Sequence, residues 1–127
     1  MASPSMTQNA YANLASGVSI VASGTSAAVA VAATTKFEVQ LQFDVLTGGT
    51  AQAAGTATIK IYRLFGAGPL SDTVPITQLA ISMGTASTHF IQSLALPTGN
   101  YSVTVTNGDS VNAISYSLTS SSIDSIA

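Results

Sequence analysis

The clearest pattern in the chain is the strict alternation of apolar and polar residues in the segment KFEVQLQFDVL, residues 36–46. Successive side chains of a β-strand point to opposite faces, so one face of this segment is apolar and the other is polar. The alternation predicts an antiparallel strand with one buried face. The apolar face carries Phe37, Val39, Leu41, Phe43 and Val45, and the polar face carries Glu38, Gln40, Gln42 and Asp44.

Shorter alternating runs recur along the chain and predict seven or eight short strands. The Ala-rich run at 27–33 is also compatible with a helix, because Ala has the highest helix propensity, but its Val, Thr and Gly neighbours favour a strand. Pro75 restricts the run that contains it to a sheet edge or a bulge. The fold class predicted is all-β, an antiparallel β-sandwich of the jelly-roll or Ig-like type. The further runs lie at residues 18–23, 27–35, 56–65, 73–83, 89–96, 101–106 and 113–119.

Clusters of Gly, Pro, Asn, Asp and Ser separate these runs and predict turns or loops. Pro97–Asn100, with the sequence PTGN, predicts a four-residue turn, and Asn107-Gly108 is the strongest short signal for a β-hairpin. The last eight residues, SSSIDSIA at 120–127, are predicted to form a polar tail. The remaining turns and loops are expected at residues 23–26, 47–56, 66–72 and 84–88.

Residues 1–16, MASPSMTQNAYANLAS, show a period of neither two nor 3.6. We predict an extended N-terminal arm at 1–16 and a single sandwich domain at 17–127. Such an arm is either a frayed terminus or a segment that orders on a neighbouring subunit. The apolar run at 17–33 is too short and too diluted by Ser, Thr and Gly for a transmembrane helix, and no Lys or Arg precedes it as in a signal peptide.

Charge is nearly absent from the chain. Charged residues make up 6% of it, against roughly 25% in an average domain, and the formal net charge is −2. Isolated soluble domains usually carry surface charge for solubility, so a neutral Ser- and Thr-rich surface predicts contact with other protein. Lys36, Lys60 and Arg63 are too few to neutralise phosphates, and we expect no nucleic-acid and no membrane partner. The chain has no cysteine, which excludes disulfides and thiolate metal sites.

His89 is the one histidine of the chain, and together with Ser87 and an aspartate it could be written as a Ser-His-Asp set. The chain has no G-x-S-x-G motif and no strand–helix unit to hold such a nucleophile. Some serine lies near any residue in a sequence this rich in Ser. We therefore interpret His89 as an edge-strand or interface residue, and we predict no enzyme activity and no catalytic residue.

The acidic residues are scattered along the chain, which argues against a metal site. Asn107, Asp109 and Asn112 loosely resemble a calcium loop but lack its spacing and its bidentate Glu, so turn geometry explains them. The glycines of 66–69, GAGP, follow a strand but open no helix, which excludes a phosphate cradle. We expect no metal and no cofactor. The five acids are Glu38, Asp44, Asp72, Asp109 and Asp124.

Three further features have weaker interpretations. Asn100-Tyr101-Ser102 is a glycosylation sequon, which we attribute to chance because a secretory signal is missing. Lys36 or Lys60 could join an Asn in an isopeptide bond assisted by Glu38, but this chemistry requires burial and the alternation places Glu38 on the polar face. Tyr62 is the one strand aromatic predicted to point outward, as in sugar-binding sandwiches, although a Tyr at a subunit contact is our preferred interpretation.

The segments GVSIVASGTSAAVAVAATTKFEVQLQFDV (17–45) and LPTGNYSVTVTNGDSVNAISYSLTSSSID (96–124) resemble small β-sandwich proteins of tailed-bacteriophage virions. The shared features are an extended N-terminal stretch, a V-x-V strand, a hairpin of the type L-P-x-G-x-Y-x-V-x-V-T-N and a Ser/Thr-rich last strand. The resemblance covers residues 17–127. It implies a structural role, since such proteins assemble as trimers or other rings at capsomer junctions and staple the shell.

From this resemblance we predict a non-enzymatic virion structural protein, and within that class a capsid decoration (cement) protein. Its expected partners are the major capsid protein or other virion proteins and further copies of itself, with a trimer favoured, and its expected localisation is the virion. A phage neck, tail or fibre component is the alternative within the same class. A secreted adhesin or carbohydrate-binding sandwich is the alternative from another class, for which a signal peptide and aromatic or calcium sites would be expected.

Overall fold

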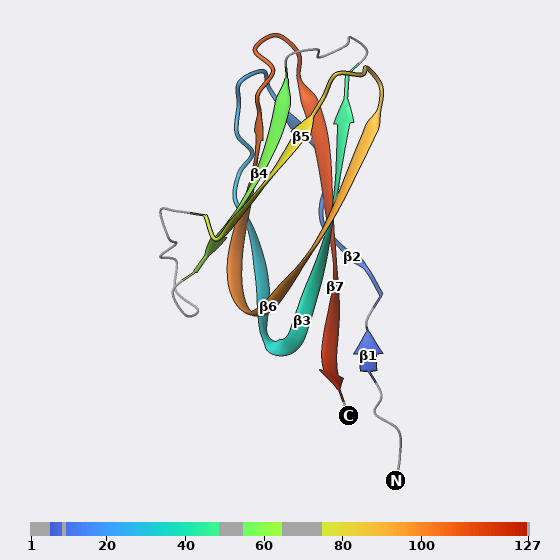
Figure 1. Ribbon diagram of the computed structural model, residues 1–127, viewed down its shortest axis with the longest axis vertical. Coiled ribbons are helices and arrows are strands. Elements are labelled where there is room, and N and C mark those ends of the chain that lie inside the picture. Colours follow the sequence, from blue (N-terminus) through green and yellow to red (C-terminus); the bar gives the residue numbers. More distant parts are fainter. Residues whose placement is uncertain (1–5, 9, 49–54, 65–74, 127) are drawn as a thin grey trace.

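The computed structural model shows two antiparallel sheets packed face to face, with strands that run along the long axis of the molecule (Figure 1). It describes residues 6–8, 10–48, 55–64 and 75–126. No helix occurs in these ranges, so the predicted all-β sandwich is confirmed. The strands are β1 (Met6–Gln8), β2 (Ala12–Ile20), β3 (Val29–Thr47), β4 (Thr56–Arg63), β5 (Thr77–Ser82), β6 (His89–Asn107) and β7 (Ile114–Ile126).

Two long strands, β3 and β6, take part in both sheets. The first part of β3 (Val29–Ala33) pairs with the last part of β6, and the second part of β3 (Glu38–Leu46) pairs with the first part of β6. Both strands bend back at the lower end of the view in Figure 1, where the register shifts between Ala33 and Glu38. The prediction of short strands is wrong here, because backbone pairing continues around the bend and joins four expected strands into two of 19 residues.

We name each sheet after one of its strands. The β7 sheet contains β2 with β1, then β7, the second part of β3 and the first part of β6. The β4 sheet contains the first part of β3, the second part of β6, then β4 and β5. Pro75 lies two residues before β5, the edge strand of the β4 sheet, in line with the edge position that its missing N–H predicted.

The prediction of a four-residue turn at Pro97–Asn100 is wrong, because these residues lie within β6. They belong to the bend, where Pro97 pairs with Glu38 and Gly99 with Ala33. Tyr101 is fully buried, and its Oη donates a hydrogen bond of 2.7 Å to the carbonyl of Pro97. A buried tyrosine bonded to the backbone a few residues upstream stabilises corners in other sandwiches, and here it holds the bent strand.

The hairpin predicted at Asn107-Gly108 is also wrong. Asn107 ends β6 in the β4 sheet opposite Ala57, whereas Ile114 begins β7 in the other sheet, so residues 108–113 cross between the sheets. The N–H of Gly108 donates a hydrogen bond of 2.9 Å to the carbonyl of Thr56. A Cβ at Gly108 would collide with this same oxygen. The glycine therefore serves a close backbone approach and not a hairpin turn.

The alternating segments supply the core as predicted. The side chain of Phe37 lies outside the described residues, but the other apolar positions of residues 39–45 are buried, and so are the inward positions of β4, of the second part of β6 and of β7. These residues form one cluster between the sheets. They are Val39, Leu41, Phe43, Val45, Ala57, Ile59, Ile61, Tyr101, Val103, Val105, Ile114, Tyr116 and Leu118.

Described segments near both ends of the chain form strands that the sequence analysis did not predict. Residues 120–126 continue β7 and are not a polar tail, because Ser120–Ile123 pair with β3 and Met6 pairs with Ile126. Ala12–Ile20 form β2 on the other side of β7, so the boundary expected at residue 16 falls inside a strand. The first 16 residues show no alternation because β2 lies at the sheet edge and buries only Ile20.

The other expected turns and loops lie at their breaker residues, as far as these residues are described. A turn at Ala22–Ser23 is closed by a hydrogen bond of 2.9 Å from the N–H of Gly24 to the carbonyl of Val21. A second turn lies at Ala86–Ser87. The loop expected at 66–72 and most of the loop at 47–56 lie outside the described residues.

Candidate functional site

The outer face of the β7 sheet carries the chemically varied side chains of the sandwich. Strand pairing places one residue from each of four strands in a row across it, as in Asn13, Thr119, Gln42 and Ser93. These positions alternate with the buried positions along each strand. The alternation in the sequence therefore predicted polar residues on this outer face. We call this surface the polar face. Its further members include Gln40, Asp44, His89, Ile91, Ala95, Ser115 and Ser117.

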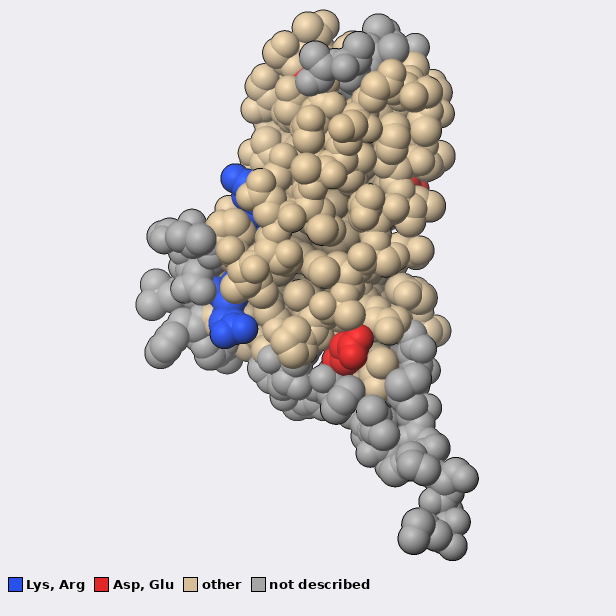
Figure 2. Space-filling model, viewed as in Figure 1, with Lys and Arg blue, Asp and Glu red and all other residues tan. Residues whose placement is uncertain are grey.

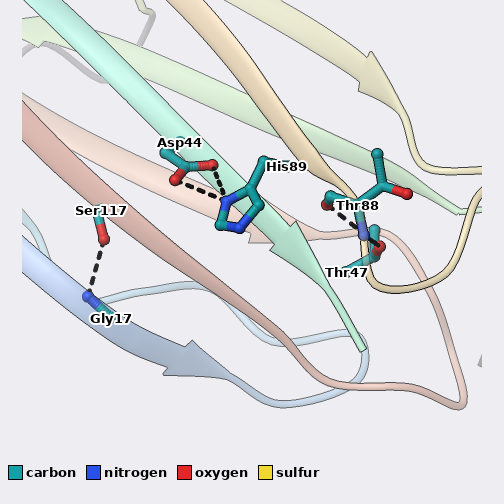
Figure 3. Close-up of polar contacts among 6 residues, drawn as sticks. All are labelled: Gly17, Asp44, Thr47, Thr88, His89 and Ser117. Carbon is teal, nitrogen blue, oxygen red and sulfur yellow. Dashed lines mark hydrogen bonds and ion pairs between the residues drawn. The ribbon is translucent and has the colours of Figure 1, made fainter. Parts of the chain in front are cut away.

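The imidazole of His89 is hydrogen-bonded to the carboxylate of Asp44 on the polar face (Figure 3). The Nδ1 atom of His89 lies 2.9 and 2.8 Å from the two carboxylate oxygens of Asp44. Asp44 is opposite Ile91 and His89 is opposite Leu46, so the two side chains are diagonal neighbours on adjacent strands. The side chain of His89 is 59% exposed and that of Asp44 is 36% exposed, and such surface pairs contribute only about 0.2–1 kcal/mol.

A threonine network fixes the start of β6 beside this pair. Thr47 is buried at the end of β3, and its Oγ1 donates a hydrogen bond of 2.6 Å to the carbonyl of Thr85. The N–H of Thr88 donates to the same Oγ1 at 2.9 Å (Figure 3). The network thus ties the turn before His89 to β3.

The structure does not assemble the Ser-His-Asp set. Ser87 lies in the turn before β6 with φ +49°, and its N–H donates to the carbonyl of Gly48. Ser117 lies opposite Asp44, but its Oγ accepts a hydrogen bond of 2.9 Å from the N–H of Gly17 (Figure 3). Among the described residues, no hydroxyl is hydrogen-bonded to the imidazole, as the serine of a Ser-His-Asp set would be.

Two shallow hollows flank the ends of β2. One, of about 280 Å³, is lined by Tyr11, Gln40, Leu41, Ser93, Leu94 and Ala95. The other, of about 240 Å³, is lined mainly by Ser19, Leu46, Thr47 and Ala113–Ser115. Tyr11 is 50% exposed and adds an aromatic ring to amide and hydroxyl groups. The residue pattern did not indicate Tyr11 as a site residue, because Tyr11 stands in the aperiodic segment.

In the loop that resembles a calcium site, the side chains of Asn107 and Asp109 form hydrogen bonds with the backbone. The Nδ2 of Asn107 donates to the carbonyls of Asn112 at 2.8 Å and of Ile20 and Val21 at 3.3 Å. The Oδ1 of Asp109 accepts the N–H groups of Val111 and Asn112, both at 2.7 Å. The bonds from Asn112 and Val111 lower the pKa of Asp109 below its ordinary value. The loop therefore joins the end of β2 to the crossing between the sheets.

The remaining candidates are not brought together. Glu38 lies at the bend opposite Pro97 and Ile123, whereas Lys60 lies in β4 opposite Gln78 and Thr104. Both are half-buried, so neither has the burial that isopeptide chemistry requires. The side chain of Lys36 and the whole of 66–69 lie outside the described residues.

Tyr62 points outward from β4 as expected and is half-buried, and Asn100 of the sequon is half-buried at the bend. In Figure 2 charged side chains are few and well separated. Within the described ranges, no three residues of the types His, Cys, Asp and Glu are grouped as a metal site would need. A search of the same ranges found no helix long and apolar enough to cross a membrane.

No family model and no curated protein matches the sequence. Solved structures match its fold. A chain of the infectious bursal disease virus structure (Gx strain) superposes with a TM-score of 0.58 at 12% identity, over 94% of this chain and 32% of that one. A chain of the T13 particle of the same virus gives 0.53 at 14% identity, over 94% and 31%. Tripeptidyl peptidase 2 gives 0.55 at 10% identity, over 89% of this chain and 10% of that one.

These matches show the fold and not a function, since one sandwich architecture hosts many roles. The chain spans about a third of the viral chains that it matches. Its β-sandwich is therefore one that also occurs in viral particles. The closer resemblance to tailed-bacteriophage proteins stays a prediction.

Proposed function

We propose that this chain is a non-enzymatic structural protein of a virion, and within that class a capsid decoration protein of a tailed bacteriophage. It binds the head through its neutral surfaces and stabilises the shell by contacts between subunits. Its partners are the major capsid protein or other virion proteins and further copies of itself, arranged as a trimer. Nucleic acid and membranes are not expected partners, because the chain has three basic residues.

The observation that supports this proposal most is the combination of a rigid sandwich with an almost uncharged surface (Figure 2). Hydroxyl and amide groups lose less free energy than charges when they leave water, so such a surface is suited to contacts with other protein. The polar face presents Asn, Gln, Ser and Thr from four adjacent strands. Many modest contacts of this kind give stable attachment when the copies are repeated over a shell.

The viral fold match is in line with this role, although it carries no information about attachment. A non-enzymatic role is supported by the His89–Asp44 pair, whose imidazole is hydrogen-bonded to Asp44 and to no hydroxyl within the described residues. A neck, tail or fibre component would use the same neutral surface. The position of the chain in the particle, on the head or on the neck, tail or fibre, distinguishes a decoration protein from these alternatives.

The test is binding of the purified chain to phage heads that lack it, measured by co-sedimentation. We expect saturation at a fixed number of copies per capsomer and a homo-oligomer by light scattering. A variant without residues 1–16 should bind more weakly while its far-UV circular dichroism stays that of a β-sandwich. A chain in which a Gly-Ser segment of equal length replaces residues 1–16 separates the effect of sequence from that of length.

Absence of saturable binding, with the chain found in no purified particle, would reject the proposal. Equal affinity of the truncated and full chains would reject the contribution of residues 1–16 alone. A monomer found in neck or fibre fractions would replace decoration by the alternative within the same class.

One observation favours a second function, the binding of neutral carbohydrate. The hollow beside Tyr11 combines an exposed aromatic ring with Gln40 and Ser93, which are groups that pack against and hydrogen-bond sugars. Under this alternative, the chain is a monomer, and a glycan array gives a hit that Tyr11→Ala abolishes and Tyr62→Ala does not.

A further inference from the structure

Strand β2 is attached to the sandwich almost entirely through its backbone. Of its nine residues only Ile20 is buried, and its pairing with β7 is interrupted by two register shifts. Gly17 adopts φ +56°, and a Cβ built there would meet no atom within 4 Å. Such a strand is released at little cost to the core, since Ile20 stays in place and, of Ala12–Ser19, only Ala15 packs against the core cluster.

The chain that follows β2 is held firmly, which defines a pivot. The carbonyls of Ile20 and Val21 accept hydrogen bonds from the Asn107 side chain. Beyond them, the N–H of Ser23 donates to the carbonyl of Asp109, and that of Ser26 donates to the carbonyl of Val105, both at 2.8 Å. Movement of β2 therefore stops at Ile20. Because β1 precedes β2 in the chain and also pairs with β7, β1 must leave together with Ala12–Ser19.

This segment and Tyr11, the residue directly before it, expose large apolar side chains. Tyr11, Leu14 and Val18 are 50%, 37% and 37% exposed. They gain burial only against another molecule, and each Å² of apolar surface removed from water contributes roughly 25 cal/mol. When β2 is paired with β7 of its own chain, these apolar side chains therefore remain partly exposed to water.

We propose that β2 exchanges between copies of this chain: Ala12–Ser19 leaves its own β7 and pairs, in the same register, with β7 of a second copy. The same backbone hydrogen bonds form in both arrangements, so the balance depends on the linker and on the apolar surface buried between copies. Eight residues in a strand reach roughly 26 Å from the pivot. The vacated β7 edge accepts the incoming strand because an edge presents unpaired N–H and C=O groups.

The sequence favours a second copy as the occupant. Residues 1–35 contain no charged residue, and neither does β7 from Ile114 to Ile123. Two copies therefore approach along these strands without like-charge repulsion. This inference deepens the proposed function, in which copies of the chain assemble on a shell, and it rests on that proposal only for its biological setting.

The absence of cysteine makes the exchange measurable. Asn13 on β2 lies directly opposite Thr119 on β7. Equal amounts of full-length Asn13→Cys and Thr119→Cys are mixed, unfolded, refolded together and oxidised. We expect a covalent dimer that contains one chain of each variant, in several-fold higher yield than dimers from either variant alone. Mass spectrometry of the cross-linked peptide identifies the bond.

The matched control uses Gln42→Cys and Ser93→Cys, which lie directly opposite each other on the same face in the β3–β6 pair. These strands are held by buried neighbours, so their mixture should give no dimer above the level of the single variants. Equal yields from the two mixtures would overturn the exchange. A double variant N13C/T119C that forms the bond in neither a monomer nor a dimer would overturn the pairing itself.

The cross-linking test uses the purified chain without capsids. Its result is therefore independent of the capsid-binding test of the proposed function. Heads that bind a chain showing no exchange would leave the proposed function in place and remove the exchange. A chain that shows exchange but binds no heads would leave the exchange in place and remove the proposed function.

Discussion

Strands β2 and β4 have nine and eight residues but are held in the sandwich by different interactions. Strand β4 pairs with β5 and β6, and its Ala57, Ile59 and Ile61 are completely buried. Strand β2 pairs with β7 alone among the described strands and buries only Ile20. Side-chain packing therefore holds β4 in one place, whereas β2 depends on backbone hydrogen bonds that β7 of another copy could equally supply.

The difference shows how a nearly uncharged chain can be both rigid and adaptable. Packing is specific to one geometry, because a buried side chain fits one cavity. A backbone ladder is nearly independent of sequence and contributes about 0.5–1.5 kcal/mol per hydrogen bond. We infer that the fold is encoded by strands such as β4 and that association is left to strands such as β2.

The largest expected change in the free energy of unfolding is for a substitution in the buried strand β4. Ile59→Ala should lower the free energy of unfolding by about 2–5 kcal/mol, because it leaves a cavity between the sheets. Val18→Ala in β2 should change it by less than about 0.5 kcal/mol, because that side chain is exposed. Urea denaturation measures both. Similar losses for the two variants would contradict the comparison.

A smaller effect is expected where β4 begins. Gly108→Ala should destabilise the fold by about 1–3 kcal/mol, since its Cβ would meet the carbonyl of Thr56. Gly84→Ala is the matched control, because a Cβ there meets nothing within 4 Å. That variant should be neutral or slightly stabilising in the same denaturation experiment. A stable Gly108→Ala protein would show that the two backbones are not in close contact.

The other end of β4 lies beside the bend, where Arg63 pairs with Tyr101. Tyr101→Phe removes the hydrogen bond to Pro97 and should lower the free energy of unfolding by about 0.5–1.5 kcal/mol. Tyr62→Phe, on the outer face of β4, serves as the comparison and should be close to neutral. Equal effects of both would mean that the Tyr101 hydroxyl does not hold the bend.

The smallest expected effect concerns the loop that fixes the pivot of β2, and it depends on pH. The pKa of Asp109 is lowered in the folded chain, so its stabilising contribution is present above the unfolded pKa of about 3.9. The contribution is lost as the pH falls from there through the folded pKa. Between pH 5 and pH 3 the urea midpoint of Asp109→Asn should fall less than that of the wild type. Parallel pH profiles would refute the role of this carboxylate.

The outcome of the sequence predictions follows from what each signal measures. Alternation at residues 39–45 identified the buried face correctly, because burial of one face imposes a period of two. The signals at Pro97–Asn100 and Asn107-Gly108 marked changes of chain direction but not their type, since a strand bend, a hairpin and a crossing between sheets use the same residues. The His89–Asp44 pair was not predicted, because it depends on the register between β3 and β6.

The sequence by itself determined the class of the protein: an all-β sandwich with a mostly Val, Ile, Leu and Phe core and a neutral Ser- and Thr-rich exterior. These properties are local, because each strand carries its own alternation and its own outer face. Only the tertiary structure decided that β3 and β6 each bend through both sheets, that residues 108–113 cross between the sheets, and that the aperiodic residues 12–16 become part of an edge strand. These features depend on which strands pair, and that choice is made by packing between segments far apart in the sequence.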